Sequence, residues 1–340
     1  MAKHVAILLG GWSAERQVSL ASGRGIVGGL RAKGHEVTAI DAATAEVLSD
    51  ERLAGMARIG VEPPAPLTGS RRALATLPPL LEADLAFIAV HGGEGEDGTL
   101  QAFLDMLEIP YTGSGARACA LTWDKQVTRL VLREGGVPVA PGFLVTEPER
   151  GGSFDLGEIA GRIAGGTGFP AIVKPNAQGS TIGVTLLESE AGLADALAKA
   201  RGSGGEVLIE RFIPGHELTV AVFDGEAFPV TEIVADTGFY DYERKYQKGH
   251  TRYMTPAEIP ADRALETQEL SRRAFRLFNC AGVARIDFRM TPEGELFCLE
   301  INAVPGMTEL SLVPMGARAL GIEYPELVHR MAEAALRRKR

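Results

Sequence analysis

Two apolar runs that end in paired glycines constrain the fold of this chain more than any other feature. Val5–Leu9 leads into Gly10-Gly11, and Asp84–Val90 leads into His91-Gly92-Gly93. Strand–turn–helix units of this kind predict a parallel sheet, with ligands at the carboxyl ends of its strands. We therefore expect an N-terminal α/β, Rossmann-like domain over residues 1–120. Its other predicted elements are a strand at 36–40, helices at 19–33 and 99–107, and a helix-and-loop excursion at 42–79.

The pattern changes near residue 121, where short strands alternate with single helices. This favours two α+β lobes, over 121–213 and 214–340, the second of which carries the candidate metal ligands. In the first lobe we expect strands at 142–145, 169–174, 183–187 and 207–212, with helices at 124–134 and 191–201. In the second we expect strands at 217–223, 227–234, 282–290 and 295–301, and a helix at 261–279.

Composition excludes several classes of function. The chain has 340 residues and a formal net charge of −9 at pH 7, so no basic field attracts nucleic acid. No window of about 18 residues is free of charge, and the first apolar run is too short for a signal peptide. The cysteines, Cys119, Cys280 and Cys298, are too far apart in sequence for a C-x-x-C site and predict buried thiols in a reducing compartment. We expect a cytoplasmic protein with no membrane or nucleic-acid partner.

The last two predicted strands concentrate charged residues that could hold a metal. Because side chains at i and i+2 share a face, Arg285 and Asp287 should lie together, and so should Glu300 and Asn302, with Leu299 on the opposite face. A hairpin that pairs Met290 with Glu295 would put Arg285 opposite Glu300. Carboxylate and amide oxygens suit Mg²⁺. The alternative is an Arg–Glu pair on a solvated face, which the apolar surroundings of Glu300 disfavour.

Three further segments carry weaker signals. Lys174 ends an apolar strand beside the glycine- and hydroxyl-rich stretch 176–183, which fits either a phosphate cradle or an ordinary turn, and no Walker A motif is present. Glu210 and Glu217 flank a strand junction where a nucleotide ribose could lie. The run 94–98 is either functional or an acidic turn that caps the next helix.

Five motifs in order resemble the D-alanine–D-alanine ligase family of the ATP-grasp superfamily, from about residue 4 to residue 330. They are Leu9-Gly10-Gly11-Trp12-Ser13-Ala14-Glu15-Arg16, His91-Gly92-Gly93-Glu94-Gly95-Glu96-Asp97-Gly98, Phe239-Tyr240-Asp241-Tyr242, Lys245-Tyr246, and Asn302-Ala303-Val304-Pro305-Gly306-Met307-Thr308. The resemblance implies an ATP-grasp fold and a homodimer that binds ATP, D-alanine and two Mg²⁺, for which Mn²⁺ can substitute.

The resemblance also implies roles for individual residues. The ATP site would include Lys125, Lys174, Glu210, Phe212, Ile213 and Glu217, and the metal ligands would be Asp287, Glu300 and Asn302. Glu15 and His91 would bind the first D-alanine, whereas Lys245, Ser311 and Leu312 would bind the second. Arg285 and the backbone of Gly306 would stabilise the tetrahedral intermediate. Ser180 and Tyr246 would join Glu15 in a hydrogen-bonded triad that closes a loop within 236–255 over the site.

The expected reaction joins two D-alanines through a D-alanyl phosphate, for peptidoglycan precursor synthesis. Alternatives remain open at this stage. They are a D-alanine–D-lactate ligase or another ATP-grasp carboxylate–amine ligase, a nucleotide-binding module without catalysis, and a dinucleotide-dependent oxidoreductase. The tyrosine at position 246 disfavours the D-lactate ligase. The oxidoreductase is disfavoured because Gly10-Gly11-Trp12 does not continue as G-x-G-x-x-G.

Overall fold

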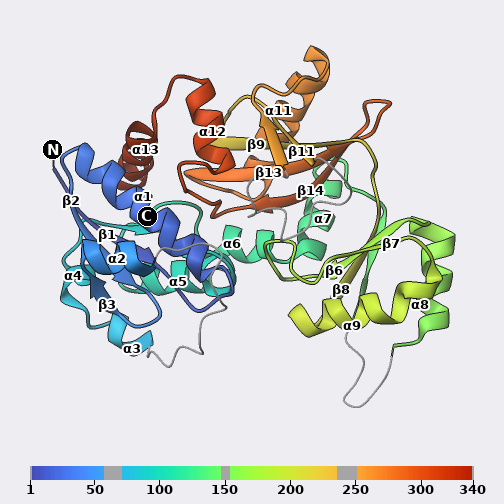
Figure 1. The fold of residues 1–340 in the computed structure, drawn as a ribbon, viewed down its shortest axis with the longest axis horizontal. Coiled ribbons are helices and arrows are strands. Elements are labelled where there is room, and N and C mark those ends of the chain that lie inside the picture. Colours follow the sequence, from blue (N-terminus) through green and yellow to red (C-terminus); the bar gives the residue numbers. More distant parts are fainter. Residues whose placement is uncertain (1, 57–70, 147–153, 236–250, 339–340) are drawn as a thin grey trace.

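Three sheets make up the chain in a computed structural model that describes residues 2–56, 71–146, 154–235 and 251–338 (Figure 1). The first sheet has the order β3-β2-β1-β4, with β1 parallel to both β2 and β4. The glycine turns follow β1 and β4 at one edge, as the sequence predicts. The strands are β1 (His4–Leu9), β2 (Glu36–Asp41), β3 (Glu46–Leu48) and β4 (Leu85–Ile88).

Helices cover this first sheet, and one of them comes from the far end of the chain. The C-terminal helix α13 (Tyr324–Arg337) packs beside α1 (Arg16–Ala32), and Leu30 and Val328 share one buried core (Figure 1). The predicted helix-and-loop excursion contains short helices, as expected, and also strand β3, which was not predicted; residues 57–70 within it lie outside the described part. The remaining helices here are α2 (Asp50–Met56), α3 (Arg71–Leu74), α4 (Pro78–Leu81), α5 (Thr99–Met106) and the 3₁₀ turn η1 (Gly93–Gly95).

The second sheet is antiparallel, with the order β5-β8-β6-β7. Its strands are β5 (Gly142–Val145), β6 (Ala171–Pro175), β7 (Thr185–Leu187) and β8 (Val207–Arg211). Helices α6 (Ala116–Trp123) and α7 (Lys125–Glu134) lead into it from the first sheet (Figure 1). Its other helical elements are α8 (Leu156–Arg162), η2 (Ile163–Thr167), η3 (Glu190–Gly192) and α9 (Leu193–Gly204).

The third sheet has six strands, of which five follow the order β12-β11-β9-β13-β14 while β10 pairs with β9. It contacts helix α11 (Ala261–Leu277) through β9 and β13, and helix α12 (Leu312–Ala319) through β9. Buried residues of β9, β13 and β14 form one core with α11, which includes Phe275 and Phe278. The strands are β9 (His216–Phe223), β10 (Glu226–Ala227), β11 (Thr231–Ala235), β12 (Thr251–Met254), β13 (Val283–Met290) and β14 (Leu296–Asn302).

The pairing of β13 with β14 corrects the sequence prediction. Met290 pairs with Leu296, not with Glu295, and an irregularity between Asp287 and Phe288 shifts the register by one further residue. Glu300 therefore lies opposite Asp287, and Arg285 lies opposite Asn302. A β-bulge of this kind puts an extra residue on one strand and re-aims its side chains. A prediction based on strict alternation cannot anticipate it.

Candidate active site

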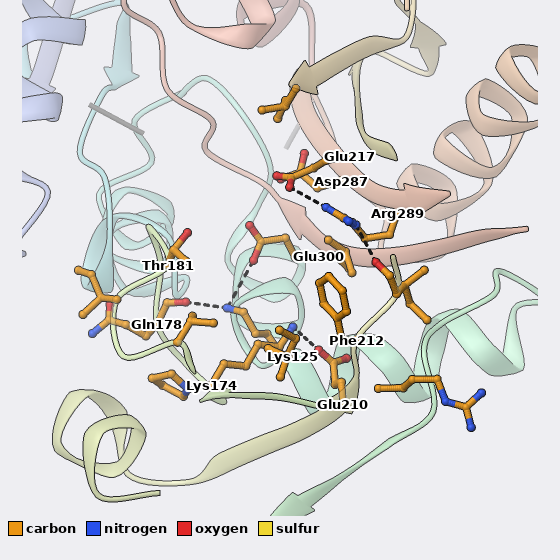
Figure 2. A pocket seen from close by; sticks show the side chains of 18 of the residues that line it. Lys125, Lys174, Gln178, Thr181, Glu210, Phe212, Glu217, Asp287, Arg289 and Glu300 are labelled. Carbon is orange, nitrogen blue, oxygen red and sulfur yellow. Dashed lines mark hydrogen bonds and ion pairs between the residues drawn. The ribbon is translucent and has the colours of Figure 1, made fainter. Parts of the chain in front are cut away.

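A cavity of about 160 Å³ lies between the second and third sheets, and most of the predicted nucleotide and metal residues line it (Figure 2). Strands β6 and β8 supply one wall, and β13 and β14 supply the other. The predicted residues on its lining are Lys125, Lys174, Glu210, Phe212, Ile213, Glu217, Arg285, Asp287, Glu300 and Leu312. Leu299 also lines the cavity, so the prediction that it faces away from Glu300 is wrong; the bulge explains the change.

A buried ion cluster forms one end of the cavity. Glu210 pairs with Lys174 through one carboxylate oxygen and with Arg129 through the other. All three side chains are at least nine-tenths buried. Burial alone would raise the pKa of Glu210, but Lys174 and Arg129 outweigh it and hold that pKa below its usual value. Glu210 is therefore a carboxylate at neutral pH, and it orients Lys174 at the cavity wall.

Lys125 reaches the same cavity from the first turn of α7. Its ammonium donates to the carbonyl of Gln178 at 2.6 Å and lies 3.6 Å from Glu300 Oε2. Asp124 caps the helix by accepting from the Val127 N–H at 2.9 Å. Burial lowers the pKa of Lys125, against a smaller opposing effect of Glu300. Lys125 thus connects the loop after β6 to the end of β14 (Figure 2).

Arg285, Asp287 and Glu300 form a second charged group on the third sheet. Arg285 donates to both oxygens of Asp287, at 2.9 Å and 2.7 Å, and Thr219 Oγ1 donates to Asp287 Oδ1 at 2.6 Å. Glu300 lies 4.0 Å from Arg285. These contacts confirm that Arg285 and Asp287 share a face. Two carboxylates and a guanidinium therefore converge on one end of the cavity.

Arg289 organises the far wall of the cavity. It bonds Glu217 at 3.1 Å and the carbonyls of Ile213 and Gly215 at 3.0 Å each. Its guanidinium also lies 5.5 Å from the ring centre of Phe212, within the range of a cation–π contact. Arg289 thus binds two carbonyls of the loop between β8 and β9, and the Phe212 N–H of the same loop donates to the Pro170 carbonyl (Figure 2).

Glu15 and Ser180 meet outside the cavity lining. Glu15 lies at the N-terminal end of α1, is 8% exposed, and accepts a hydrogen bond from Ser180 Oγ. Ser180 and Thr181 both have positive φ, 52° and 59°, which for a β-branched residue such as Thr181 is strained by about 1–3 kcal/mol. Thr181 lines the cavity. The strained turn therefore links the Glu15 group to the cavity.

His91 is buried at the first sheet's edge, and both of its ring nitrogens contact the protein. Nδ1 lies 3.2 Å from the Val304 carbonyl and Nε2 lies 3.1 Å from Ser22 Oγ. Ser13 Oγ donates to the His91 carbonyl at 2.5 Å and accepts from the Glu15 N–H at 3.1 Å. The Ser13 hydroxyl thereby links the backbone of His91 to the backbone of Glu15.

Glu96 is a carboxyl group beside these residues, within the acidic run 94–98, and no individual role was predicted for it. Its Oε1 accepts from the Gly92 N–H at 2.9 Å and lies 3.9 Å from His91 Nδ1. Burial, followed by the charge of Glu15, raises the pKa of Glu96 to about 8. Close to neutral pH this group is mainly protonated.

The segment after β14 carries the remaining predicted residues. Asn302 Oδ1 accepts from the Val304 N–H at 3.0 Å. Ser311 Oγ accepts from the Thr308 N–H at 3.1 Å, and a Cβ at Gly306 would lie 3.3 Å from Ser311 Oγ. Lys245 and Tyr246 lie outside the described residues, as does most of the predicted lid. Arg129 was not predicted, although its position four residues after Lys125 on the buried face of α7 was a usable signal.

Comparison with known proteins identifies the family. The model for the "D-ala D-ala ligase N-terminus" matches residues 4–114, and the model for the "D-ala D-ala ligase C-terminus" matches residues 131–333. The chain belongs to the D-alanine–D-alanine ligase family. The Anaeromyxobacter sp. (strain Fw109-5) D-alanine–D-alanine ligase is 39% identical over 98% of this chain and 97% of its own. The Syntrophotalea carbinolica D-alanine–D-alanine ligase is 40% identical over 99% of this chain and 97% of its own.

Solved structures of the family share the whole fold. The D-alanine–D-alanine ligase from Bacillus anthracis is 28% identical with a TM-score of 0.75, and matches 99% of this chain and 98% of its own. The same enzyme complexed with ATP gives a TM-score of 0.78 at equal coverage and identity. The family models cover Glu15, His91, Lys174 and Glu300, whereas Lys125 falls between the two matched ranges.

Two features are absent from the residues that the structure describes. None of the helices within them has the length and apolar character needed to cross a membrane. Within the same residues, no three or more His, Cys, Asp or Glu side chains are grouped as a metal site. The predicted metal set is not a group of this kind, because it contains two carboxylates and one amide.

Proposed function

We propose that this chain joins two D-alanine molecules into D-alanyl-D-alanine with ATP, through a D-alanyl phosphate, and so supplies a precursor of peptidoglycan. The observation that carries the proposal is the charged cavity. Lys125, Lys174 and Arg285 bring three cations to one enclosed space, and Asp287 and Glu300 bring two carboxylates. ATP binding alone would not require Arg285 to face both carboxylates.

Charge explains the first chemical step. A carboxylate is a poor acyl donor, and phosphoryl transfer from ATP converts it into an acyl phosphate. Negative charge spreads over the phosphate oxygens as this happens, and preorganised cations stabilise it. Lys174 is held by Glu210, and Lys125 is held by the Gln178 carbonyl. We assign these two lysines to the phosphates, with Phe212, Ile213 and Glu217 beside the nucleoside.

The donor chemistry at the end of the cavity fits a divalent metal. Asp287 and Glu300 face each other across β13 and β14, and hard oxygen ligands of this type suit Mg²⁺. We propose that Asp287, Glu300 and Asn302 hold two Mg²⁺, which Mn²⁺ can replace. When bound, the metal would neutralise phosphate charge. Arg285, which lies beside Asp287 and Glu300, would bind oxygens of the phosphoryl group that is transferred.

The second step joins the amine of the second D-alanine to the activated carbonyl. We propose that Glu15, oriented by Ser180, takes the ammonium of the first D-alanine, with His91 nearby. Arg285 and the Gly306 N–H would stabilise the oxyanion that forms, and phosphate would leave. Ser311 and Leu312, at the start of α12, would contact the second D-alanine together with Lys245. Tyr246 would join Glu15 and Ser180 when the lid closes.

The domain arrangement is part of the same proposal. We assign residues 1–120 to a Rossmann-like substrate domain, and 121–213 and 214–340 to the two lobes of an ATP-grasp fold. The cavity between the second and third sheets supports this division, since an ATP-grasp site lies between lobes. A cytoplasmic homodimer stays a prediction of the family resemblance.

The decisive assay measures phosphate and dipeptide with ATP and D-alanine, compared with ATP alone. We expect phosphate only when D-alanine is present, with one dipeptide formed per phosphate. Phosphate release that ignores D-alanine would contradict the proposal. Adding D-lactate in competition between pH 6 and 9 tests the main alternative, because a depsipeptide ligase would form D-alanyl-D-lactate in preference.

A further inference from the structure

Ser22 joins two segments of the candidate active site that lie far from it in the sequence. Its side chain is fully buried on helix α1. Ser22 Oγ lies 3.1 Å from His91 Nε2 and accepts from the Met307 N–H at 3.3 Å. One hydroxyl group therefore contacts both His91, in the turn after β4, and Met307, in the segment beside Gly306.

The hydrogen-bond roles around Ser22 follow from the chemistry of its partners. The Val304 carbonyl can only accept, so His91 Nδ1 carries the proton. A neutral imidazole then presents Nε2 as an acceptor. The hydroxyl of Ser22 accepts from the Met307 N–H and donates to Nε2. The Ser22 hydroxyl therefore uses a lone pair for Met307 and its proton for His91. For neutral His91, this is the one assignment of donors and acceptors that satisfies both contacts.

Met307 is held from its other side as well. Tyr324 Oη donates to the Met307 carbonyl at 2.6 Å. Burial, with a smaller effect of Glu309, raises the pKa of Tyr324, so its phenol stays a donor. The N–H and the C=O of Met307 are therefore both anchored. Gly306, the preceding residue, is less buried than Met307, and its position depends on these two bonds.

We propose that Ser22 is a positioning residue that couples His91 to the Gly306–Met307 segment and so keeps the Gly306 N–H aimed at the oxyanion. This inference rests on the proposed function. It concerns the second step alone, in which the amine of the second D-alanine attacks the acyl phosphate and phosphate leaves. If that step slows, water consumes the acyl phosphate instead and returns D-alanine and phosphate. The expected signature is uncoupling of phosphate release from dipeptide formation.

Helix α1 supplies a matched control. Ser19 is equally buried, one turn earlier on the same helix, and its hydroxyl donates to the Ala89 carbonyl at 2.5 Å. Ser19→Ala and Ser22→Ala remove the same atom from the same face. Both variants should lose thermal stability to a similar degree, but only Ser22→Ala should disturb His91 and Met307.

The experiment compares parent, Ser22→Ala, Ser19→Ala and Tyr324→Phe for phosphate, dipeptide, Tm and KM for ATP. For Ser22→Ala we expect the dipeptide kcat to fall about 10- to 100-fold, the effect of a small misplacement. Its dipeptide yield per phosphate should fall below one, with KM for ATP unchanged. Tyr324→Phe should also lower the dipeptide yield per phosphate, because it removes the hydrogen bond to the Met307 carbonyl. Ser19→Ala should stay coupled.

Two failures are distinguishable. If the parent forms dipeptide and Ser22→Ala is as well coupled as Ser19→Ala, the positioning role of Ser22 is wrong while the proposed function stands. If the parent forms no dipeptide, the proposed function fails and the role of Ser22 falls with it. An equal loss of Tm with unequal coupling is the result that separates positioning from ordinary stabilisation.

Discussion

The two halves of the candidate active site are held together by different forces. Around the cavity, ion pairs dominate: Glu210 with Lys174 and Arg129, Glu217 with Arg289, and Asp287 with Arg285. Around His91 and Met307, hydroxyls and backbone groups dominate, although the buried Arg16–Asp41 ion pair lies at the same edge of the first sheet. There Ser13, Ser22 and Tyr324 bond to the backbone, to His91, or to both.

The difference matches the chemistry that each half is proposed to handle. A triphosphate carries several charges that shift during transfer, and charges act on it over several ångströms in a poorly solvated space. An oxyanion at one carbonyl carbon needs a donor at one place, because a hydrogen bond weakens steeply with distance and angle. Charged groups therefore suit the first half, and fixed neutral donors suit the second.

The largest effect should come from Glu300→Gln. This change keeps the shape of the side chain and removes the charge that faces Asp287 and Lys125. We expect turnover to be abolished with the fold intact, as measured by dipeptide formation at saturating Mg²⁺ and by circular dichroism. Glu293→Gln, at the exposed tip of the same hairpin, is the control and should be fully active. Near-normal activity of Glu300→Gln would show that the Glu300 carboxylate is not a required metal ligand.

Lys174→Ala tests the ion cluster at the other end of the cavity. The loss of one electrostatic donor should cost about 2–4 kcal/mol of transition-state stabilisation. Glu210 keeps Arg129 as a partner, so the fold should survive. Rapid-quench measurement of phosphoryl transfer checks this, with Lys199→Ala as the control because Lys199 is exposed and its ammonium donates to the Val184 carbonyl. An unchanged rate of phosphoryl transfer would mean that Lys174 only forms a structural ion pair with Glu210.

Glu96→Gln sharpens the comparison, because Glu96 is a buried carboxyl group in the half where hydroxyls and backbone groups surround His91. Burial and Glu15 raise its pKa from 4.5 to about 8 in the folded chain. Stability due to its proton is complete below pH 4.5 and is lost as the pH rises through about 8. The Tm of the parent should therefore fall more between pH 5 and pH 9 than that of Glu96→Gln.

Glu94→Gln, in the same turn as Glu96, controls for a general effect of charge. It should follow the pH profile of the parent. Identical profiles for the parent and Glu96→Gln would mean that Glu96 titrates as an ordinary carboxyl group. The two halves would then differ less in their electrostatics than the structure indicates.

The smallest effect belongs to an ion pair outside both halves. Glu326 on α13 bonds Lys33 at 2.5 Å and Arg330 at 2.8 Å, and these partners lower its pKa to about 2. Its contribution is present above pH 4.5 and is lost as the pH falls through about 2. Since the pair is partly solvated, Glu326→Gln should lower the free energy of unfolding at pH 7 by no more than about 1 kcal/mol. Urea titrations at pH 7 and pH 3 measure it, and activity should not change.

The sequence by itself determined the local elements and which residue types meet at their ends. Apolar runs ending in glycine pairs predicted β1 and β4, and the predicted strand at 142–145 agrees with β5. The same patterns brought Lys174, Asp287 and Glu300 to strand positions that line the cavity. Helix α6 was missed because no side chain caps its start. Helix α8 was missed although Asp155 caps it by accepting from the Glu158 N–H, a usable start signal.

Only the tertiary structure decided how those elements face one another. The bulge that sets Glu300 opposite Asp287 depends on how β14 packs against its neighbours, and strict alternation contains no information about it. One partner of Glu210, Arg129, lies 81 residues away in the chain, and one partner of Ser22, Met307, lies 285 residues away. Local periodicity reports which face of an element is buried, whereas contacts at such separations arise only when whole elements pack together.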